Sequence, residues 1–180
     1  MARFTLAVVA AALSLAAAQD EMIDNPEYKG WVGQKVGAWV KFKMVRDMGE
    51  MKMDTTTTTT LKEMSAEKAV IDQATEMDKG GTKKTINMSR TLPAKIKKGT
   101  DSEGSKAEQV AEGDEEVEIG GKKYACHWVE MKITSKQGVM TVKVWRNDTI
   151  IGGAAKMTMN MDKPMKMTMT MTALEWKAGE

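Results

Sequence analysis

Apolar and polar residues alternate with a period of two along most of the chain. In the segment Ala38–Val45, Val40, Phe42 and Met44 take alternate positions, and lysines lie between them. Because successive side chains of a strand point to opposite faces of a sheet, this pattern predicts strands with one apolar and one polar face. The spacing of an amphipathic helix is nearly absent. The pattern therefore predicts a protein built mainly of β-strands.

Turn residues divide this pattern into separate strands. The Gly120-Gly121 pair lies in the middle of Glu115–Ile133 and suits the tight turn of a hairpin. The other predicted strands are Ala38–Val45, Met51–Met64, Ala69–Met77, Lys84–Leu92, Val139–Trp145, Ala154–Met161 and Met165–Trp176. About eight or nine strands with mostly short connections predict an all-β, mainly antiparallel fold. We expect a meander that forms one curved sheet or a half-barrel.

Two segments do not follow the strand pattern. Asn25–Gly37 contains Pro, Gly and Trp residues and is expected to form an entry loop or a short helical turn. Ile96–Asp114 is rich in Lys, Glu, Gly and Ser and has almost no apolar residues. Such a composition predicts a mobile charged loop at 96–114 rather than a domain boundary.

The N-terminal segment has the features of a secretory signal peptide. Arg3 precedes an uncharged apolar run, and three small residues end it at Ala18. Cleavage after Ala18 leaves residues 19–180, a length suited to a single β domain. No later segment is apolar enough to span a membrane as a helix. The sequence thus predicts an exported protein, periplasmic or extracellular, that is soluble after cleavage.

The charge pattern and the cysteine content argue against a nucleic-acid partner and an internal disulfide. The formal net charge is +2, and residues of both signs are interleaved along the chain. Nucleic-acid binding requires a clustered basic face, so we expect no nucleic-acid partner. Cys126 is the only cysteine, which excludes an internal disulfide.

Methionine is the most unusual component of the chain. There are 18 methionines, whereas the only leucines after residue 18 are Leu61, Leu92 and Leu174. Near the C-terminus, alternation places a series of thioethers on one face of two predicted strands. This series, called the Met ladder below, consists of Met157, Met159, Met161, Met165, Met167, Met169 and Met171.

The Met ladder has three interpretations. Soft sulfur ligands select Cu(I), so the ladder is a candidate copper site. Methionine also fills irregular apolar space, so the same residues are expected in a solid core in place of leucine. A flexible, polarizable face can instead line a cavity for a lipid or another apolar ligand. The pattern alone leaves these three alternatives open.

Catalytic signatures are missing from the sequence. His127 is the only histidine, and on a strand its side chain points away from that of the adjacent Cys126. The two residues therefore form no nucleophile–base pair. We see no phosphate loop, nucleophile elbow or zinc-protease motif. The sequence predicts a non-enzymatic protein with no catalytic residue and no cofactor. The five tryptophans are expected mainly in the core.

The second half of the chain resembles uncharacterised secreted bacterial proteins. The resemblance rests on Val117-x-Ile119-Gly-Gly-Lys-x-Tyr-x-Cys126-x-Trp128 and on Lys143-x-Trp145-x-x-Asp148-x-x-x-Gly152-Gly153-x-x-Lys156. The strand start Gly37-x-Trp39-Val40-x-Phe42 is similar too. This arrangement is similar to the lipoprotein-carrier-like (LolA-like) group. The resemblance implies a curved antiparallel sheet that wraps an apolar concave face.

Three functions follow as expectations. The first is an exported protein that binds a lipid or another apolar ligand, or a partner in the cell envelope. The second is a periplasmic Cu(I)-binding protein that uses the Met ladder. The third is a structural envelope module with a filled core.

Overall fold

The computed structural model describes residues 21–79, 82–97, 106–135, 138–162 and 166–180. In these ranges the chain forms strands and one short helix, so the predicted all-β fold is confirmed. The elements are β1 (Met22–Asp24), α1 (Pro26–Lys29), β2 (Trp39–Met48), β3 (Met51–Met64), β4 (Lys68–Lys79), β5 (Thr82–Pro93), β6 (Lys95–Lys97), β7 (Lys106–Ile119), β8 (Lys122–Ser135), β9 (Gly138–Arg146), β10 (Ala154–Met161) and β11 (Met167–Lys177). The predicted signal peptide, residues 1–18, lies outside the described ranges.

One large antiparallel sheet carries the fold. It has nine strands in the order β5-β4-β3-β2-β11-β10-β9-β8-β7, and β1 and β6 form a separate two-stranded sheet. The large sheet consists of two meanders, β2–β5 and β7–β11, which are joined by the pairing of β2 with β11. Among the described residues, the edge strands β5 and β7 do not pair with each other, so the sheet stays open. The predicted curved meander is confirmed.

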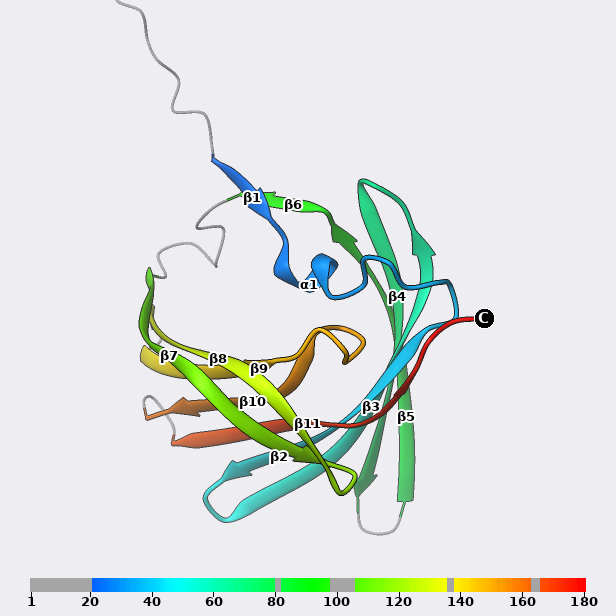
Figure 1. The fold of residues 1–180 in the computed structure, drawn as a ribbon. Helices are drawn as coiled ribbons and strands as arrows, with labels where there is room; N and C mark the ends of the chain where they lie inside the picture. Colours follow the sequence, from blue (N-terminus) through cyan, green and yellow to red (C-terminus); the bar gives the residue numbers. More distant parts are fainter. Residues whose placement is uncertain (1–20, 80–81, 98–105, 136–137, 163–165) are drawn as a thin grey trace, which may run out of the picture.

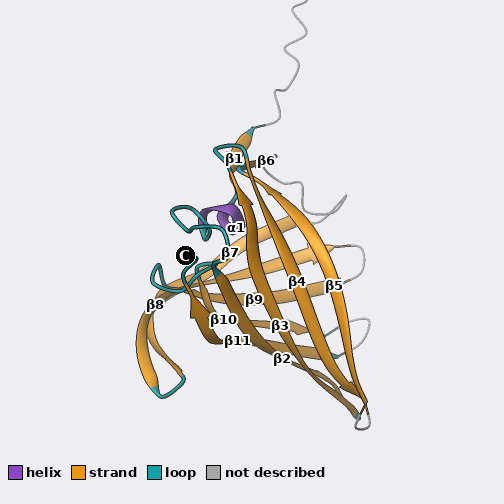
Figure 2. Ribbon diagram, turned by 90° about the vertical axis from the view of Figure 1, so that its right-hand side faces the viewer, coloured by secondary structure: helices purple, strands orange, loops and turns teal. Residues whose placement is uncertain are grey.

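The sheet curves so strongly that its two edges face each other across a central space (Figure 1). Figure 2 shows the long strands β3, β4 and β5 sweeping along one side of the molecule. α1 and the β1–β6 pair lie at one end of this space (Figure 1). The concave face thus has a covered end near α1 and an opposite end near the β2–β3 turn.

The prediction of a mobile charged loop over residues 96–114 is wrong for part of that segment. Ile96 lies in β6, and Lys106–Asp114 forms the first part of β7, which pairs with β8. Residues 98–105 lie outside the described ranges. β7 is an edge strand whose first half is exposed, so it needs no apolar face there. Without a buried face a strand loses the alternation by which it is recognised in sequence.

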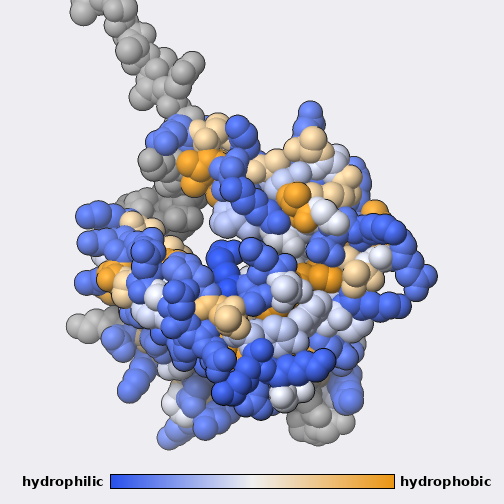
Figure 3. Space-filling model, viewed as in Figure 1, coloured by the Kyte–Doolittle hydropathy of each residue, from blue (hydrophilic) through white to orange (hydrophobic). Residues whose placement is uncertain are grey.

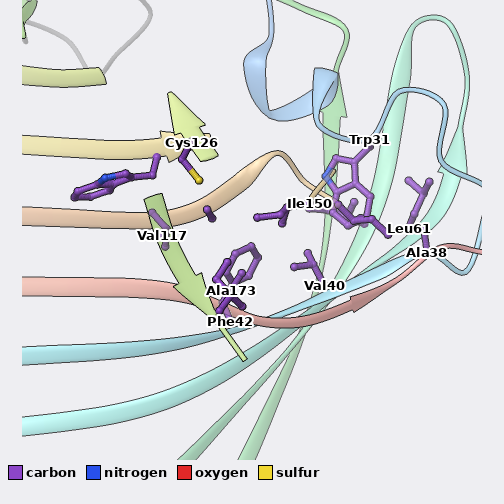
Figure 4. Close-up of a cluster of buried hydrophobic side chains, with 14 of the residues drawn as sticks. Trp31, Ala38, Val40, Phe42, Leu61, Val117, Cys126, Ile150 and Ala173 are labelled. Atoms are coloured by element: carbon purple, nitrogen blue, oxygen red, sulfur yellow. The ribbon is translucent and has the colours of Figure 1, made fainter. Parts of the chain in front are cut away.

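The covered end of the concave face is filled by a solid core (Figure 4). Trp31, Val40, Leu61 and Ile71 are each at most 2% exposed. Trp31 follows α1, whose N-cap is Asn25: the Asn25 Oδ1 accepts a hydrogen bond from the Glu27 N–H at 3.0 Å. The short helical turn expected between residues 25 and 37 is therefore present, and it packs a tryptophan onto the sheet.

Hydrogen bonds fix α1 to the strands on both sides of it. The Asn25 Nδ2 donates to the Pro93 carbonyl at 2.8 Å, and the Tyr28 hydroxyl donates to the Ser65 carbonyl at 2.7 Å. The Gly152 N–H donates to the Gly30 carbonyl at 3.0 Å. A Cβ atom on Gly30 would collide with the backbone of Gly152. The close approach therefore requires glycine at position 30.

The tip of the β7–β8 hairpin extends beyond the neighbouring strand. Pairing of β8 with β9 begins at His127, so the residues from Glu115 to Cys126 pair only with each other. β7 also packs near β10 and β11, with which it is not paired. Tyr124 contacts Trp176 edge to face, with ring centroids 5.4 Å apart. This contact holds the hairpin against β11.

Candidate ligand-binding site

A cavity of about 490 Å³ lies on the concave face. Its walls combine residues of β2, β3, β4, β5, β9, β10 and β11 with residues of the α1 region, including Pro26 and Trp31. Side chains of strands as far apart in the sheet as β5 and β9 line one cavity because the sheet curls around it. Ligand pockets usually have volumes of about 300–1,000 Å³, so this cavity has the size of a small-molecule site.

Three methionine pairs of the ladder lie directly opposite each other. The register of β10 and β11 pairs Met157 with Met171, Met159 with Met169, and Met161 with Met167. Directly opposed residues share a face, with Cβ atoms about 4.5–5.5 Å apart. Met157 and Met171 line the cavity, so the three pairs occupy the concave face. Six ladder residues thus lie on one face of two adjacent strands. Met165 lies outside the described ranges.

More methionines continue this surface onto the neighbouring strands. Met171 is opposite Met44 of β2, and Met161 is opposite Met140 of β9. Met159 is opposite Val142, which in turn is opposite Met131 of β8. The registers therefore place a band of thioethers across five adjacent strands of the concave face.

Most of this band is accessible rather than fully buried. Met169 is 8% exposed, but the other ladder methionines of the described residues, Met157, Met159, Met161, Met167 and Met171, are only partly buried. The solid core near Trp31 and the methionine band therefore differ. The core residues are enclosed, although Trp31, Val40 and Ile71 also border the cavity, and the band residues that line it are the partly exposed Met44, Met157 and Met171.

Strands β3 and β4 contribute polar side chains to the cavity. Thr57 and Thr75, on β3 and β4, share a hydrogen bond of 3.0 Å between their hydroxyl oxygens. The Gln73 Nε2 donates to the Thr59 hydroxyl at 3.3 Å. These four residues line the cavity together with Met157 and Met171. The cavity therefore combines thioether and other apolar side chains with hydroxyl and amide groups that are hydrogen-bonded to each other.

A second hollow of about 200 Å³ adjoins the cavity. The two share Met44, Thr57 and Thr75, and the second hollow extends to Arg46, Met53, Thr55 and Met77. Arg46 follows Val40, Phe42 and Met44 in the alternation of β2, so a charged side chain occupies a position of the apolar face. Sequence inspection passed over Arg46, although its place in that alternation was a readable signal.

A further hollow of about 540 Å³ lies outside the curved sheet. It is bounded by Tyr28, Gly30 and Val32 and by Asp148, Ile150 and Gly153 of the β9–β10 connection. Figure 3 shows that the surface on this side of the molecule is mostly hydrophilic. Since fewer elements contribute to this hollow and none of the Met ladder residues lines it, the concave cavity is the better candidate site.

The convex face carries a cluster of aromatic and charged residues. The Lys143 Nζ lies 3.7 Å from the Trp128 ring centroid and 4.6 Å from that of Trp145. The Trp145 Nε1 donates to the Glu115 carboxylate at 2.9 Å, and Lys143 is 3.6 Å from it. The hydrogen bond from Trp145, with the nearby lysine charges, lowers the pKa of Glu115 below its ordinary value. The cluster fastens β7 to β9.

Cys126 and His127 lie apart, as their adjacent positions on a strand predict. Cys126 is buried, and burial raises the pKa of its thiol. His127 is exposed, and its Nδ1 lies 3.1 Å from Asp114. No group of three or more His, Cys, Asp or Glu residues in the described part of the chain is arranged to hold a metal ion. No helix within the same ranges is long and apolar enough to cross a membrane.

The fold and the cavity define an all-β protein with an open, strongly curved antiparallel sheet. No family model and no curated protein matches the sequence. Among solved structures, the chain is similar to a DUF1329 family protein from Desulfovibrio piger. The two are 10% identical, the alignment covers 84% of this chain and 91% of that chain, and the TM-score is 0.34.

Proposed function

We propose that this chain is an exported, non-enzymatic protein that binds a lipid or another apolar ligand on its concave face. The observation that carries the proposal is the cavity of about 490 Å³, whose lining includes the partly exposed Met44, Met157 and Met171 of the methionine band. Apolar surface next to an open cavity is removed from water when an apolar ligand enters, and this burial is the driving force for binding.

Methionine suits such a site because its side chain is flexible and polarizable. Unbranched thioethers rearrange around ligands of different shape, whereas branched side chains impose one shape on a pocket. The opposed pairs Met157–Met171 and Met159–Met169 give a continuous surface of this kind. Met169 is buried, but Met157, Met159 and Met171 are only partly buried, whereas a filled structural core would enclose them as Leu61 is enclosed.

Two features of the sequence support the same proposal. The segment that ends at Ala18 has the pattern of a signal peptide and favours export to the periplasm or the cell exterior. The resemblance to the lipoprotein-carrier-like group implies an apolar concave face. Transport or storage of apolar molecules outside the cytoplasm is consistent with both.

Binding of a neutral apolar fluorophore tests the proposal. N-phenyl-1-naphthylamine should bind the purified protein with a blue-shifted, enhanced emission. Met157→Glu places a charge in the cavity wall and should weaken binding at least tenfold. Thr158→Glu is the matched control, since Thr158 is the next residue on the same strand and points to the convex face beside Lys143. Equal binding by both variants would contradict the proposed site.

Native mass spectrometry adds an independent test on protein purified from cells. The proposal predicts a bound apolar molecule that organic solvent extracts from the wild-type protein and that Met157→Glu lacks. A mass equal to the bare chain, together with no fluorophore binding, would favour a structural module instead.

Cu(I) binding is the second candidate function. It is favoured by the register, because opposed methionines on β10 and β11 place pairs of soft sulfur ligands on neighbouring strands. Replacing Met159 and Met169 with leucine should abolish Cu(I) binding while conserving the fold and the binding of the neutral fluorophore. A Cu(I) affinity that the double replacement leaves unchanged would rule out this site.

A further inference from the structure

We propose that the ligand is a single-chain amphiphile with an anionic head, and that Arg46 binds the head. The inference rests on the proposed apolar-ligand function and specifies the chemistry of the ligand. It starts from Arg46, the residue that breaks the apolar alternation of β2.

Arg46 lies among thioethers rather than acidic groups. Met169 of β11 is opposite it on one side, and Met53 of β3 is opposite it on the other. Among the described residues no carboxylate forms an ion pair with Arg46, and its buried Nε has no hydrogen-bond partner. A buried donor that lacks a partner is unfavourable. An anion that reached this position would supply the missing acceptor.

The other arginines of the cavity wall differ from Arg46. Arg90 is bound by Glu27, with its two terminal nitrogens 3.2 Å from the two carboxylate oxygens. Arg146 is exposed to solvent at the start of the β9–β10 connection. Arg46 is therefore the arginine on the concave face that has a buried Nε without a hydrogen-bond partner in the described residues.

The position of Arg46 suits the head of a ligand whose chain lies in the larger cavity. The hollow that contains Arg46 opens into the methionine-lined cavity at Met44 and Thr57. A guanidinium presents a planar fork of donors that fits a carboxylate or a phosphate with two parallel hydrogen bonds. The buried Thr55, next to Arg46 in the same hollow, offers a hydroxyl group to the same head.

Four twelve-carbon single-chain probes with different heads test the inference by displacement of N-phenyl-1-naphthylamine. They are dodecanoate, dodecyl phosphate, dodecanol and dodecyltrimethylammonium. The wild-type protein should bind the two anions at least tenfold more tightly than the alcohol and the cation most weakly. The order of dodecanoate and dodecyl phosphate identifies whether the head is a carboxylate or a phosphate.

Arg46→Met should remove the preference for anions and leave the affinities for the fluorophore and for dodecanol within twofold of wild type. Arg46→Lys should keep part of the preference, because it keeps the charge but loses the fork. Lys43→Met is the matched control, since Lys43 is on the other face of β2, where it pairs with Asp54 at 3.1 Å. This control should bind all four probes as the wild type does.

The experiment distinguishes a failure of the role given to Arg46 from a failure of the proposed function. Equal wild-type affinity for anions and alcohol, or an anion preference that survives Arg46→Met, would overturn the role of Arg46 while the apolar site stands. If the wild-type protein binds neither the fluorophore nor dodecanol, the proposed function fails, and the inference fails with it.

Discussion

Met157 and Met171 lie directly opposite each other on β10 and β11, and both line the cavity on the concave face. The pair therefore has two structural roles. It belongs to the cross-strand contacts that stabilise the centre of the sheet, and it forms part of a surface that stays accessible to a ligand.

The methionine band should tolerate leucine without loss of the fold. Met167→Leu combined with Met169→Leu nearly conserves side-chain volume, so the free energy of unfolding should change by less than about 1.5 kcal/mol for each replacement. Urea denaturation followed by circular dichroism measures this change. A much larger loss would mean that the thioethers hold the sheet together in a way that apolar packing does not explain.

Removal of Trp31 should be far more damaging than any change in the band. Trp31 is 2% exposed and closes the covered end of the concave face. Trp31→Ala should lower the free energy of unfolding by about 3–5 kcal/mol, the usual loss when a large buried aromatic side chain is removed. Val32→Ala, at an exposed neighbouring position, is the control and should change stability little.

The contact between Gly30 and Gly152 should not tolerate a side chain. A Cβ atom at position 30 would meet the carbonyl group of Gly152, and backbone atoms cannot move aside as a flexible side chain does. Gly30→Ala should therefore destabilise the protein and loosen α1, with faster amide hydrogen exchange at the Gly152 N–H. Wild-type exchange at that amide in the variant would contradict this account of the contact.

Stability should fall in acid partly through Glu115. The hydrogen bond from Trp145 lowers the pKa of Glu115 in the folded state below its ordinary value. The ionised carboxylate thus stabilises the fold above the unfolded-state pKa, and this contribution is lost as the pH falls through the lower folded-state pKa. Glu115→Gln should flatten the dependence of the melting temperature on pH below about 4.5.

Trp145→Phe provides a check on the partner of Glu115. It removes the indole donor and should flatten the same part of the pH profile. The double variant should be no flatter than either single variant if the two residues act as a pair. A profile for Glu115→Gln that matches the wild type would show that other groups dominate the acid response.

Cys126 should be unreactive in the native protein. The thiol is 2% exposed, and burial raises its pKa, so little thiolate forms at neutral pH. Dithionitrobenzoate should label the folded chain slowly and label it fully and rapidly after denaturation. Rapid labelling without denaturant would mean that the β7–β8 hairpin opens readily at Tyr124 and Trp176.

The sequence predicted the strands well where one face is buried. The predicted bounds Met51–Met64 and Ala154–Met161 agree with β3 and β10, because both strands alternate between a concave and a convex environment. β7 was missed before Glu115, since an exposed edge strand needs no apolar residues. Alternation also placed the Met ladder on one face, but only the register of β10 and β11 shows which methionines are opposed.

The cavity itself was beyond sequence reasoning. Whether a set of apolar residues encloses a hollow or a solid core depends on the curvature of the whole sheet. Here that curvature brings Thr75 of β4 and Val144 of β9 to the walls of one cavity. The contribution of Trp31 depends on α1, whose place is set by hydrogen bonds to Pro93 and Ser65 at distant points of the chain.

Photolabelling with a neutral diazirine-bearing long-chain alcohol, followed by peptide mass spectrometry, tests the central claim most directly. The account predicts labels on concave-face residues of β2, β10 and β11, such as Met44, Met157 and Met171, and competition by unlabelled dodecanol. Labels that concentrate on convex-face residues such as Thr158 or Thr172, or that dodecanol does not suppress, would contradict a ligand site inside the curved sheet.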